Sequence, residues 1–314
     1  MARYTLKRLL QSLLTLLIII TVVFLLMRLL PEEGYFGDSY EKLDYAQREA
    51  ILTGMGLRDP IHIQLVNFYK SLLTGDLGDS IIFRPNVPVT EIIAEKIPYS
   101  VRFGLAAVGI SLFTGITLGI AMARYKDRAI DQLGTAYIVF IQAVPAAVYF
   151  ILIQIFITDL LNLPMLFSMN RPITWLLPTI SMSLGGTASY AMWMRRYMVD
   201  ELNKDYVKLA RAKGLTSKKL AVSHVFRNAF VPMVQYLPTA ILLTIAGSIY
   251  IESLYSIPGM GGLLVEVIKR QDNTLVQALV VIYSSIGIVG LFLGDILMAI
   301  FDPRINLDKK EGAR

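Results

Sequence analysis

The residues with the most chemical potential gather in one charged, basic stretch, residues 200–232, which lies between two apolar segments. Within it, Tyr206, Leu209 and Lys213 repeat at helical spacing and are followed by Gly214, a helix C-cap signal. A threonine and a serine shortly afterwards are good N-caps for a second helix. The pattern predicts two short amphipathic helices that meet at a glycine. We interpret this inner loop either as a solvated hairpin or as a docking element with an apolar edge and a basic rim.

Residues suited to catalysis or metal binding are scarce in the rest of the chain. Cysteine is absent, which removes disulfides and thiolate metal sites, and both histidines, His62 and His224, lie outside the long apolar runs. No GxxxxGK[ST] motif occurs, so this chain should not bind ATP through a P-loop. No serine or aspartate belongs to a recognisable nucleophile motif. We therefore expect no catalytic residue, no metal site and no cofactor in this chain.

The elements that must position the inner loop are long apolar runs. Hydrophobic residues make up 55% of the chain and charged residues 17%, compared with roughly 25% charged in an average soluble domain. Each run exceeds the roughly 20 residues that cross the hydrocarbon core of a bilayer as a helix. We expect an all-α polytopic membrane protein. Its six transmembrane helices should lie at about 9–30, 100–123, 133–157, 173–194, 231–254 and 276–300.

The distribution of Lys and Arg predicts the orientation. Most of the 30 Lys and Arg residues fall in the N-terminal tail, residues 124–128, residues 195–227 and the C-terminal tail. By the positive-inside rule these segments are cytoplasmic, so both termini should lie inside. The net charge of +6 then follows from topology, and we expect no nucleic-acid partner.

The predicted organisation has four parts. Residues 1–30 form the N-terminal tail and the first transmembrane helix, and residues 31–97 form an ordered extracellular part, the outer segment, with two short helices. Residues 98–305 form a five-helix core that includes the inner loop at 200–232, and residues 306–314 are a cytoplasmic tail.

Small residues and prolines within the expected spans bear on helix packing. Gly115 and Gly119 form a GxxxG pair, as do Gly290 and Gly294, and such pairs let helix backbones approach closely. We expect intrachain packing at both pairs, with a second subunit as the alternative contact. Prolines in the third, fourth and fifth spans should kink those helices, and such helices could line a substrate path. These prolines are Pro145, Pro178 and Pro238.

Ionisable groups are few in the expected spans. Arg102, Asp159, Glu252 and Asp295 all lie towards span ends, so the middle of the membrane is almost uncharged. An ion-coupled carrier usually places such groups near the midplane. The pattern therefore argues against a stand-alone channel or ion-coupled carrier, and an intramembrane enzyme lacks a nucleophile and base.

Two neighbouring stretches carry a resemblance. Tyr206-Val-Lys-Leu-Ala-Arg-Ala-Lys-Gly-Leu215, followed by His224-Val-Phe-Arg-Asn-Ala-Phe-Val-Pro232, resembles the cytoplasmic "EAA" loop of ATP-binding cassette importer permeases, in the dipeptide/oligopeptide/nickel branch. The Glu-Ala-Ala positions hold Lys208, Leu209 and Ala210, so a salt bridge from that glutamate to an ATPase is not carried over. Further stretches that resemble this branch are Gly56-Leu-Arg-Asp-Pro60, Gly75-Asp-Leu-Gly78, Pro98-Tyr-Ser100, Ser256-Ile-Pro-Gly-Met-Gly-Gly-Leu263 and Phe301-Asp-Pro-Arg304.

The resemblance implies the type I importer permease architecture and a division of labour. A second homologous permease subunit would complete the pathway, two ATPase subunits would dock on the inner loops and use ATP and Mg, and an extracellular binding protein would deliver substrate. The substrate implied is a dipeptide or oligopeptide, with nickel or a metal chelate as the alternative, and the location is a bacterial or archaeal cytoplasmic membrane. The ATPase-docking residues implied are Tyr206, Lys208, Leu209, Ala210, Arg211, Ala212, Lys213, Gly214 and Leu215.

One further motif leaves two readings open. Pro258, Gly259, Gly261 and Gly262 could form a tight extracellular turn. They could equally belong to a short re-entrant piece that gates the outer mouth or meets the binding protein.

Overall fold

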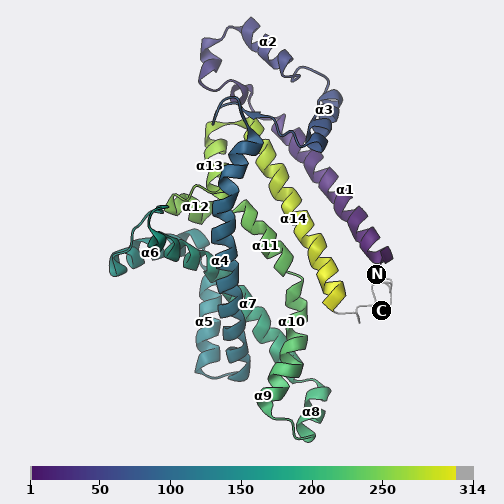
Figure 1. Ribbon diagram of the computed structural model, residues 1–314, viewed down its shortest axis with the longest axis vertical. Coiled ribbons are helices and arrows are strands. Elements are labelled where there is room, and N and C mark those ends of the chain that lie inside the picture. Colours follow the sequence, from purple (N-terminus) through teal and green to yellow (C-terminus); the bar gives the residue numbers. More distant parts are fainter. Residues whose placement is uncertain (1, 302–314) are drawn as a thin grey trace.

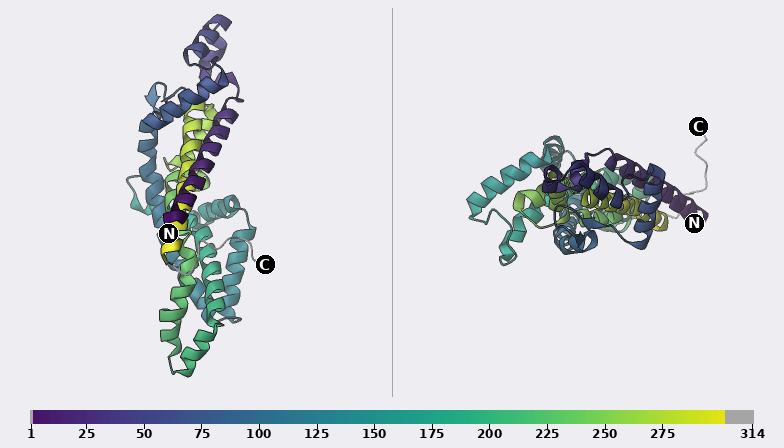
Figure 2. Two further views of the ribbon diagram at one scale, coloured as in Figure 1. Left: turned by 90° about the vertical axis from the view of Figure 1, so that its right-hand side faces the viewer. Right: turned by 90° about the horizontal axis from the view of Figure 1, so that it is seen from above.

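The computed structural model describes residues 2–301, so the expected tail at 306–314 and all but the first residue of the motif at 301–304 lie outside the described residues. The molecule is long and helical, with the outer segment at one end and the inner loop at the other (Figure 1). A view from the side shows the same separation of the two ends (Figure 2). The outer segment and the inner loop are thus joined only through the helices between them.

The outer segment contains the two helices that its spacing predicts, α2 (Tyr45–Gly54) and α3 (Ile61–Thr74). Asp44 begins α2 in a capping box, because its carboxylate accepts the Gln47 N–H while the Gln47 side chain accepts the Asp44 N–H. α3 ends at Gly75, which has the left-handed φ of 76°. The remaining elements are the 3-10 helices η1 (Glu32–Tyr35) and η2 (Gly37–Lys42) and the antiparallel strands β1 (Asp79–Ser80) and β2 (Val87–Pro88).

Among the described residues, three single helices are long and apolar enough to cross a membrane. They are α1 (Ala2–Met27), α4 (Val89–Arg124) and α14 (Asn273–Phe301). These helices coincide with the first, second and sixth expected spans. α4 begins ahead of the expected start near residue 100, so its first turns belong to the outer segment.

Bent helix pairs can raise the number of spans to six in the described part of the chain. α5 (Ala129–Ala143) and α6 (Ala146–Leu161) meet at 109° and cover the third expected span. The stretch His224–Val234 meets α11 (Leu237–Ala246) at 43°, on the fifth expected span. The third pair, which meets at 85°, is α12 (Ile249–Tyr255) and α13 (Met260–Arg270).

The fourth expected span lies on α7 (Leu176–Leu202), which is long enough to cross a membrane but is not among the helices that are also apolar enough. Its serines, threonines and glycines lower its hydropathy, and several of them are buried in the bundle. Thr187, for example, shares a 2.8 Å hydrogen bond with Thr114 of α4. α7 is therefore an interior helix whose polar groups are paired within the protein.

Both GxxxG pairs pack within the chain, as expected. A Cβ at Gly119 would lie 2.6 Å from the Ala191 carbonyl oxygen of α7. A Cβ at Gly294 would lie 2.3 Å from the backbone oxygen of Gln235, between α10 (Arg227–Val234) and α11. Gly115 and Gly290 make similar approaches to α7 and α11. Close contact of α4 with α7, and of α14 with α10 and α11, thus requires the absence of a side chain.

The three prolines act differently from the expected kinks. Pro145 ends α5 and is the N-cap of α6, so it separates two helices rather than bending one. Pro178 lies in the first turn of α7, where backbone N–H groups have no intrahelical partner. Pro238 lies at the start of α11, next to the 43° bend. The expectation of a kink inside a continuous helix is wrong at Pro145 and Pro178.

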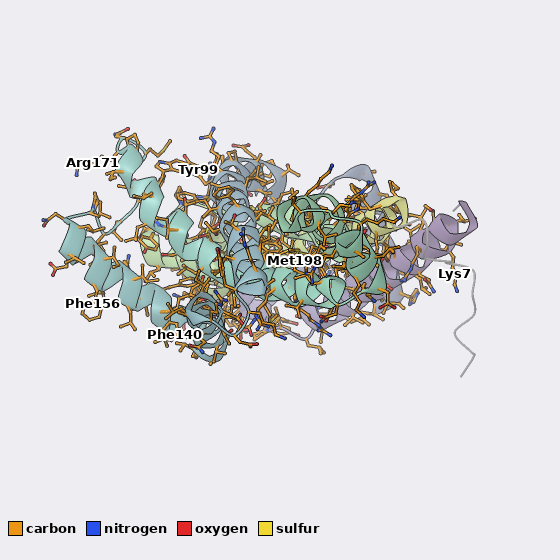
Figure 3. All side chains as sticks on the ribbon, turned by 90° about the horizontal axis from the view of Figure 1, so that it is seen from below. Lys7, Tyr99, Phe140, Phe156, Arg171 and Met198 are labelled. Carbon is orange, nitrogen blue, oxygen red and sulfur yellow. The ribbon has the colours of Figure 1, made fainter. Side chains whose placement is uncertain are left out.

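The α5–α6 break gives the molecule a projecting arm. In Figure 1, α6 extends away from the bundle formed by α4, α7 and α14. Seen from below, Phe156 and Arg171 lie at one extreme of the molecule and Lys7 at the other, with Met198 between them (Figure 3). Phe156 and Leu160 are among the large exposed apolar residues of this arm. Such a surface is compatible with lipid or with another membrane helix.

Candidate functional site

The inner loop folds as its sequence predicts. α8 (Asp205–Ala212) is followed by Gly214, whose φ is 80°, and by the single-turn α9 (Ser217–Leu220). The Lys219 N–H donates to Thr216 Oγ1 at 3.4 Å, so Thr216 caps the second helix. A π-helical stretch, η4 (Ala221–Phe226), connects α9 to α10. The loop is thus an ordered elbow that projects from the far end of the molecule (Figure 1).

The apolar side of the elbow is largely used within the chain. Val207 of α8 and Leu220 of α9 are buried together with Met194 and Met198 of α7. Val225 and Ala229 join the same cluster from the following helices. Burial of this cluster fixes the elbow on the end of α7, so the loop is held rigidly with respect to the bundle.

The opposite side of the elbow faces outward. Leu209 keeps 58% of its surface exposed, which is high for a large apolar side chain. Lys208, Arg211, Ala212 and Lys213 are exposed beside it. Tyr206, Ala210 and Leu215 are half-buried. The structure thus brings the nine docking residues named from the sequence into one elbow and presents an apolar residue inside a basic rim.

Polar contacts fasten α8 to its neighbours. Tyr206 donates a 2.7 Å hydrogen bond to Glu201 at the end of α7, and Asn228 of α10 donates to the Tyr206 hydroxyl at 3.3 Å. Burial, and then the Glu201 carboxylate, raise the pKa of Tyr206, so the hydroxyl remains a donor near neutral pH. Lys208 pairs with Asp205 in the same helix at 2.8 Å, and both side chains are exposed. That pair contributes little stability.

The glycine motif at 256–263 encloses a buried carboxylate. Glu252 of α12 is fully buried and accepts hydrogen bonds from Ser100 Oγ at 2.7 Å and from the Ser248 N–H at 3.2 Å. Its other oxygen accepts the N–H groups of Gly261 at 2.7 Å and Gly262 at 3.1 Å, at the start of α13. This geometry satisfies a charge that would otherwise be costly to bury.

Glycine is required on two sides of that carboxylate. A Cβ at Gly259 would lie 2.4 Å from the Glu252 Cδ, and one at Gly261 would lie 2.6 Å from the Ile249 backbone nitrogen. Pro258 lies in the sharp turn between α12 and α13, directly before Gly259. The motif is therefore a turn between two short helices that meet at 85° around Glu252. The sequence shows the proline and glycines of this motif, but it does not show that they enclose the Glu252 carboxylate.

A second buried carboxylate joins the outer segment to the bundle. One oxygen of Asp272 accepts Ser80 Oγ at 2.6 Å and the N–H groups of Ile82 and Phe83 at 3.0 and 2.9 Å. The other accepts the Leu275 N–H at 3.2 Å, which caps α14. An aspartate directly before a long apolar run is an N-cap signal that sequence reasoning missed.

A charged pair joins α5 to α7, the helix that leads into the inner loop. Asp131 of α5 is buried, and Arg195 of α7 donates to both of its oxygens, with Nη2 2.7 Å from Oδ2. The Asp127 N–H donates to the same carboxylate at 2.9 Å. Arg195 was counted above only among the basic residues that predict orientation. In the structure it also fixes the distance between α5 and α7 near the loop.

Two family models match the chain. Residues 115–307 match the binding-protein-dependent transport system inner membrane component. Residues 1–103 match the N-terminal part of the membrane component of binding-protein-dependent transport systems. Together these matches cover the outer segment, the bundle and the inner loop.

Three transport permeases are similar in sequence to most of this chain. The dipeptide transport system permease protein DppB of Bacillus subtilis is 33% identical over 311 residues, 99% of this chain and 100% of that protein. The glutathione transport system permease protein GsiC of Salmonella typhimurium is 31% identical over 307 residues, 98% and 99% of the two chains. The oligopeptide transport system permease protein AmiC of Streptococcus pneumoniae is 38% identical over 212 residues, 67% of this chain and 42% of that protein. The chain therefore belongs to the binding-protein-dependent transport system inner membrane components, and it is a multi-pass permease of the ATP-binding cassette importer type in the cytoplasmic membrane.

Proposed function

We propose that this chain is one of two permease subunits of an ATP-driven importer of short peptides. The observation that carries the proposal is the whole-length similarity to permeases named for dipeptide and glutathione transport. The exposed elbow of the inner loop supports it, because a separate ATPase needs a rigid element on which to act. No P-loop sequence occurs in this chain, so ATP and Mg would be used by partner subunits.

In this proposal the residues of the inner loop dock an ATPase. Leu209 would enter an apolar groove of the partner, and Lys208, Arg211 and Lys213 would set its orientation. The buried cluster beneath the elbow would carry the movement of the ATPase into α7. A second, homologous permease would supply the other half of the pathway, and both termini would be cytoplasmic.

The Glu252 turn would act at the other side of the membrane. Ser100 of α4 donates to Glu252 and accepts the Met260 N–H at 2.7 Å, so one hydroxyl joins α4, α12 and α13. A substrate-binding protein that moves α13 would have to break these hydrogen bonds or move α4 and α12 together with α13. We therefore propose Pro258, Gly259, Gly261 and Gly262 as part of an outer gate.

Co-purification from native membranes tests the proposal. A tagged chain extracted in mild detergent should bring with it two ATPase subunits and a second permease. ATP hydrolysis by the complex, reconstituted with its binding protein, should rise when a dipeptide or tripeptide is added. Stimulation by a nickel chelate and by no peptide would favour the metal alternative. A chain that purifies alone at every detergent strength would contradict the importer assignment.

A further inference from the structure

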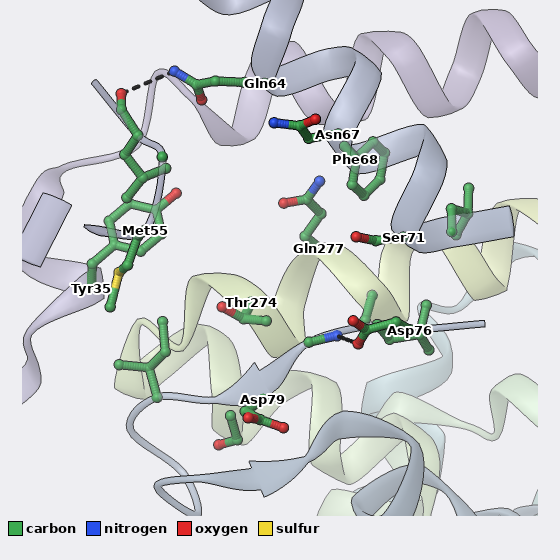
Figure 4. Close-up of a pocket in the computed structure, with 18 of the residues that line it drawn as sticks. Tyr35, Met55, Gln64, Asn67, Phe68, Ser71, Asp76, Asp79, Thr274 and Gln277 are labelled. Carbon is green, nitrogen blue, oxygen red and sulfur yellow. Dashed lines mark hydrogen bonds between the residues drawn. The ribbon is translucent and has the colours of Figure 1, made fainter. Parts of the chain in front are cut away.

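A cavity of about 640 Å³ lies where the outer segment meets the bundle, between α3, the β1–β2 hairpin and the start of α14. In Figure 4, Gln64 and Asn67 of α3 lie at the top of the view, Gln277 of α14 lies in the middle with Ser71 of α3 to its right, and Thr274 of α14 lies below. The volume falls within the range of roughly 300–1,000 Å³ that holds small ligands. The lining residues Asp76 and Asp79 are exposed, so the cavity opens to solvent.

Three charged side chains line this cavity, and none of them has an opposite charge as a partner among the described residues. Arg28 donates to the Tyr35 hydroxyl at 2.9 Å and stacks on Phe24, but no carboxylate pairs with it in residues 2–301. The Asp76 side chain accepts only the Gly78 N–H, at 2.8 Å, within the described chain. In Figure 4, Tyr35 lies at one side of the cavity and Asp76 at the other, with Gln277 between them. Charges of both signs thus face one space without neutralising each other.

Three residues that line this cavity each have a buried polar atom without a partner. In the described part of the chain, the Arg28 Nε, Gln64 Oε1 and Gln277 Nε2 atoms are buried and make no hydrogen bond. The Gln64 amide nitrogen donates to the carbonyl oxygens of Leu57 and Asp59, at 2.9 and 2.8 Å, so the unpaired atom of this amide is its oxygen. Buried polar groups are almost always paired. One free acceptor and two free donors match the N–H and C=O groups of a peptide backbone.

We propose that this cavity binds a short zwitterionic peptide. The peptide ammonium group would lie against Asp76 and Asp79, its backbone between Gln64 and Gln277, and its carboxylate near the Arg28 guanidinium. The site rests on the proposed function and deepens it, because it gives the permease its own contact with the substrate at the end opposite the inner loop. A zwitterionic lipid headgroup has the same charge pattern, and competition by such a headgroup distinguishes it from a peptide.

Photo-cross-linking on the intact transporter in nanodiscs tests the site. The probe is a tripeptide with free termini, alanine–benzoylphenylalanine–alanine, because benzophenone reacts readily with methionine and Met55 lines the cavity. We expect saturable labelling of Met55 or another lining residue. Unlabelled trialanine should compete, whereas N-acetylated trialanine amide and glycerophosphoethanolamine should not. Competition by glycerophosphoethanolamine equal to that by trialanine would assign the cavity to lipid and overturn the proposal.

Charge removal provides the matched comparison. The double variant Asp76→Asn and Asp79→Asn should raise the half-saturating probe concentration about tenfold, and Gln277→Leu should raise it without any change in charge. Asp44→Asn is the control, since it removes one charge in the outer segment but lies outside the cavity. Labelling by all variants as in the native chain would overturn the site.

The same preparations separate this inference from the proposed function. Normal peptide uptake with an unlabelled cavity would overturn the binding site alone. Absence of peptide uptake by the native complex would overturn the proposed function, and a peptide site would fall with it. Uptake that declines in parallel with labelling across the variants would support both.

Discussion

At the scale of single residues, two buried carboxylates organise the end of the molecule that carries the outer segment. Glu252 and Asp272 each accept at least four hydrogen bonds, several of them from backbone N–H groups at the start of a helix. Such bonds are stronger than those between neutral groups. The carboxylates also join segments that are far apart in sequence. Removing either charge should therefore loosen a junction rather than a single helix.

The Glu252→Gln substitution should destabilise the fold. An amide presents an NH₂ group where the carboxylate accepts N–H or O–H donors, which leaves at least one buried donor without a partner. We expect a loss of about 1–3 kcal/mol in the free energy of unfolding, seen as a lower unfolding temperature in detergent. Glu41→Gln, at an exposed position, is the matched control. Equal unfolding temperatures for the two variants would argue against a buried, bonded Glu252.

The Asp272→Asn substitution should release the outer hairpin. One carboxylate oxygen that now accepts three backbone N–H groups and a hydroxyl would become a weaker, neutral acceptor. Amide hydrogen exchange at Ile82 and Phe83 should become about tenfold faster, which corresponds to roughly 1.4 kcal/mol of local opening free energy. Asp44→Asn should leave exchange in α2 nearly unchanged, because Asn is an equally good N-cap. Unchanged exchange at Ile82 in the Asp272 variant would contradict the junction.

At the scale of elements, the helices divide into those that the sequence predicts closely and those that depend on distant partners. The elbow at Gly214 was predicted from local signals, and the structure has it. The capping box at Asp44 and the C-cap at Gly75 also have local signals, although they were not predicted. The break at Pro145 was predicted only as a kink, because local sequence does not reveal where the following helix packs. Ser80 and Asp272 are 192 residues apart, so no local pattern could pair them. The cavity beside them was missed for the same reason.

The contact between α4 and α7 gives a prediction at this scale. Gly119→Ala should destabilise the protein by about 1–3 kcal/mol, because its methyl group would collide with the Ala191 carbonyl and with Met194. Gly109→Ala lies on the same helix with nothing within 4 Å of the added Cβ. That change should be neutral or stabilising by up to about 1 kcal/mol, because Ala is the better helix former. Thermal unfolding of both variants in one detergent measures the difference, and equal effects would contradict the packing.

At the scale of the whole molecule, the outer segment and the inner loop lie at opposite ends and are joined by the helices of the bundle (Figure 1). The loop is fixed to α7 by a buried apolar cluster, and α7 is fixed to α4 by close backbone contact. α4 in turn reaches the Glu252 junction through Ser100. A force applied to the elbow therefore has a continuous packed route to the outer end.

The proposed docking of an ATPase on the inner loop can be tested by comparing two glycine variants in the assembled transporter. Gly214 and Gly75 both have a left-handed φ, 80° and 76°, and both have open space around an added Cβ. Gly214→Val should strain the elbow and cut peptide-stimulated ATP hydrolysis and uptake at least tenfold, with the chain still in the membrane. Gly75→Val should impose similar strain in the outer segment and leave ATPase co-purification intact. Native uptake and ATP hydrolysis by the Gly214 variant would contradict the proposal that the inner loop docks an ATPase.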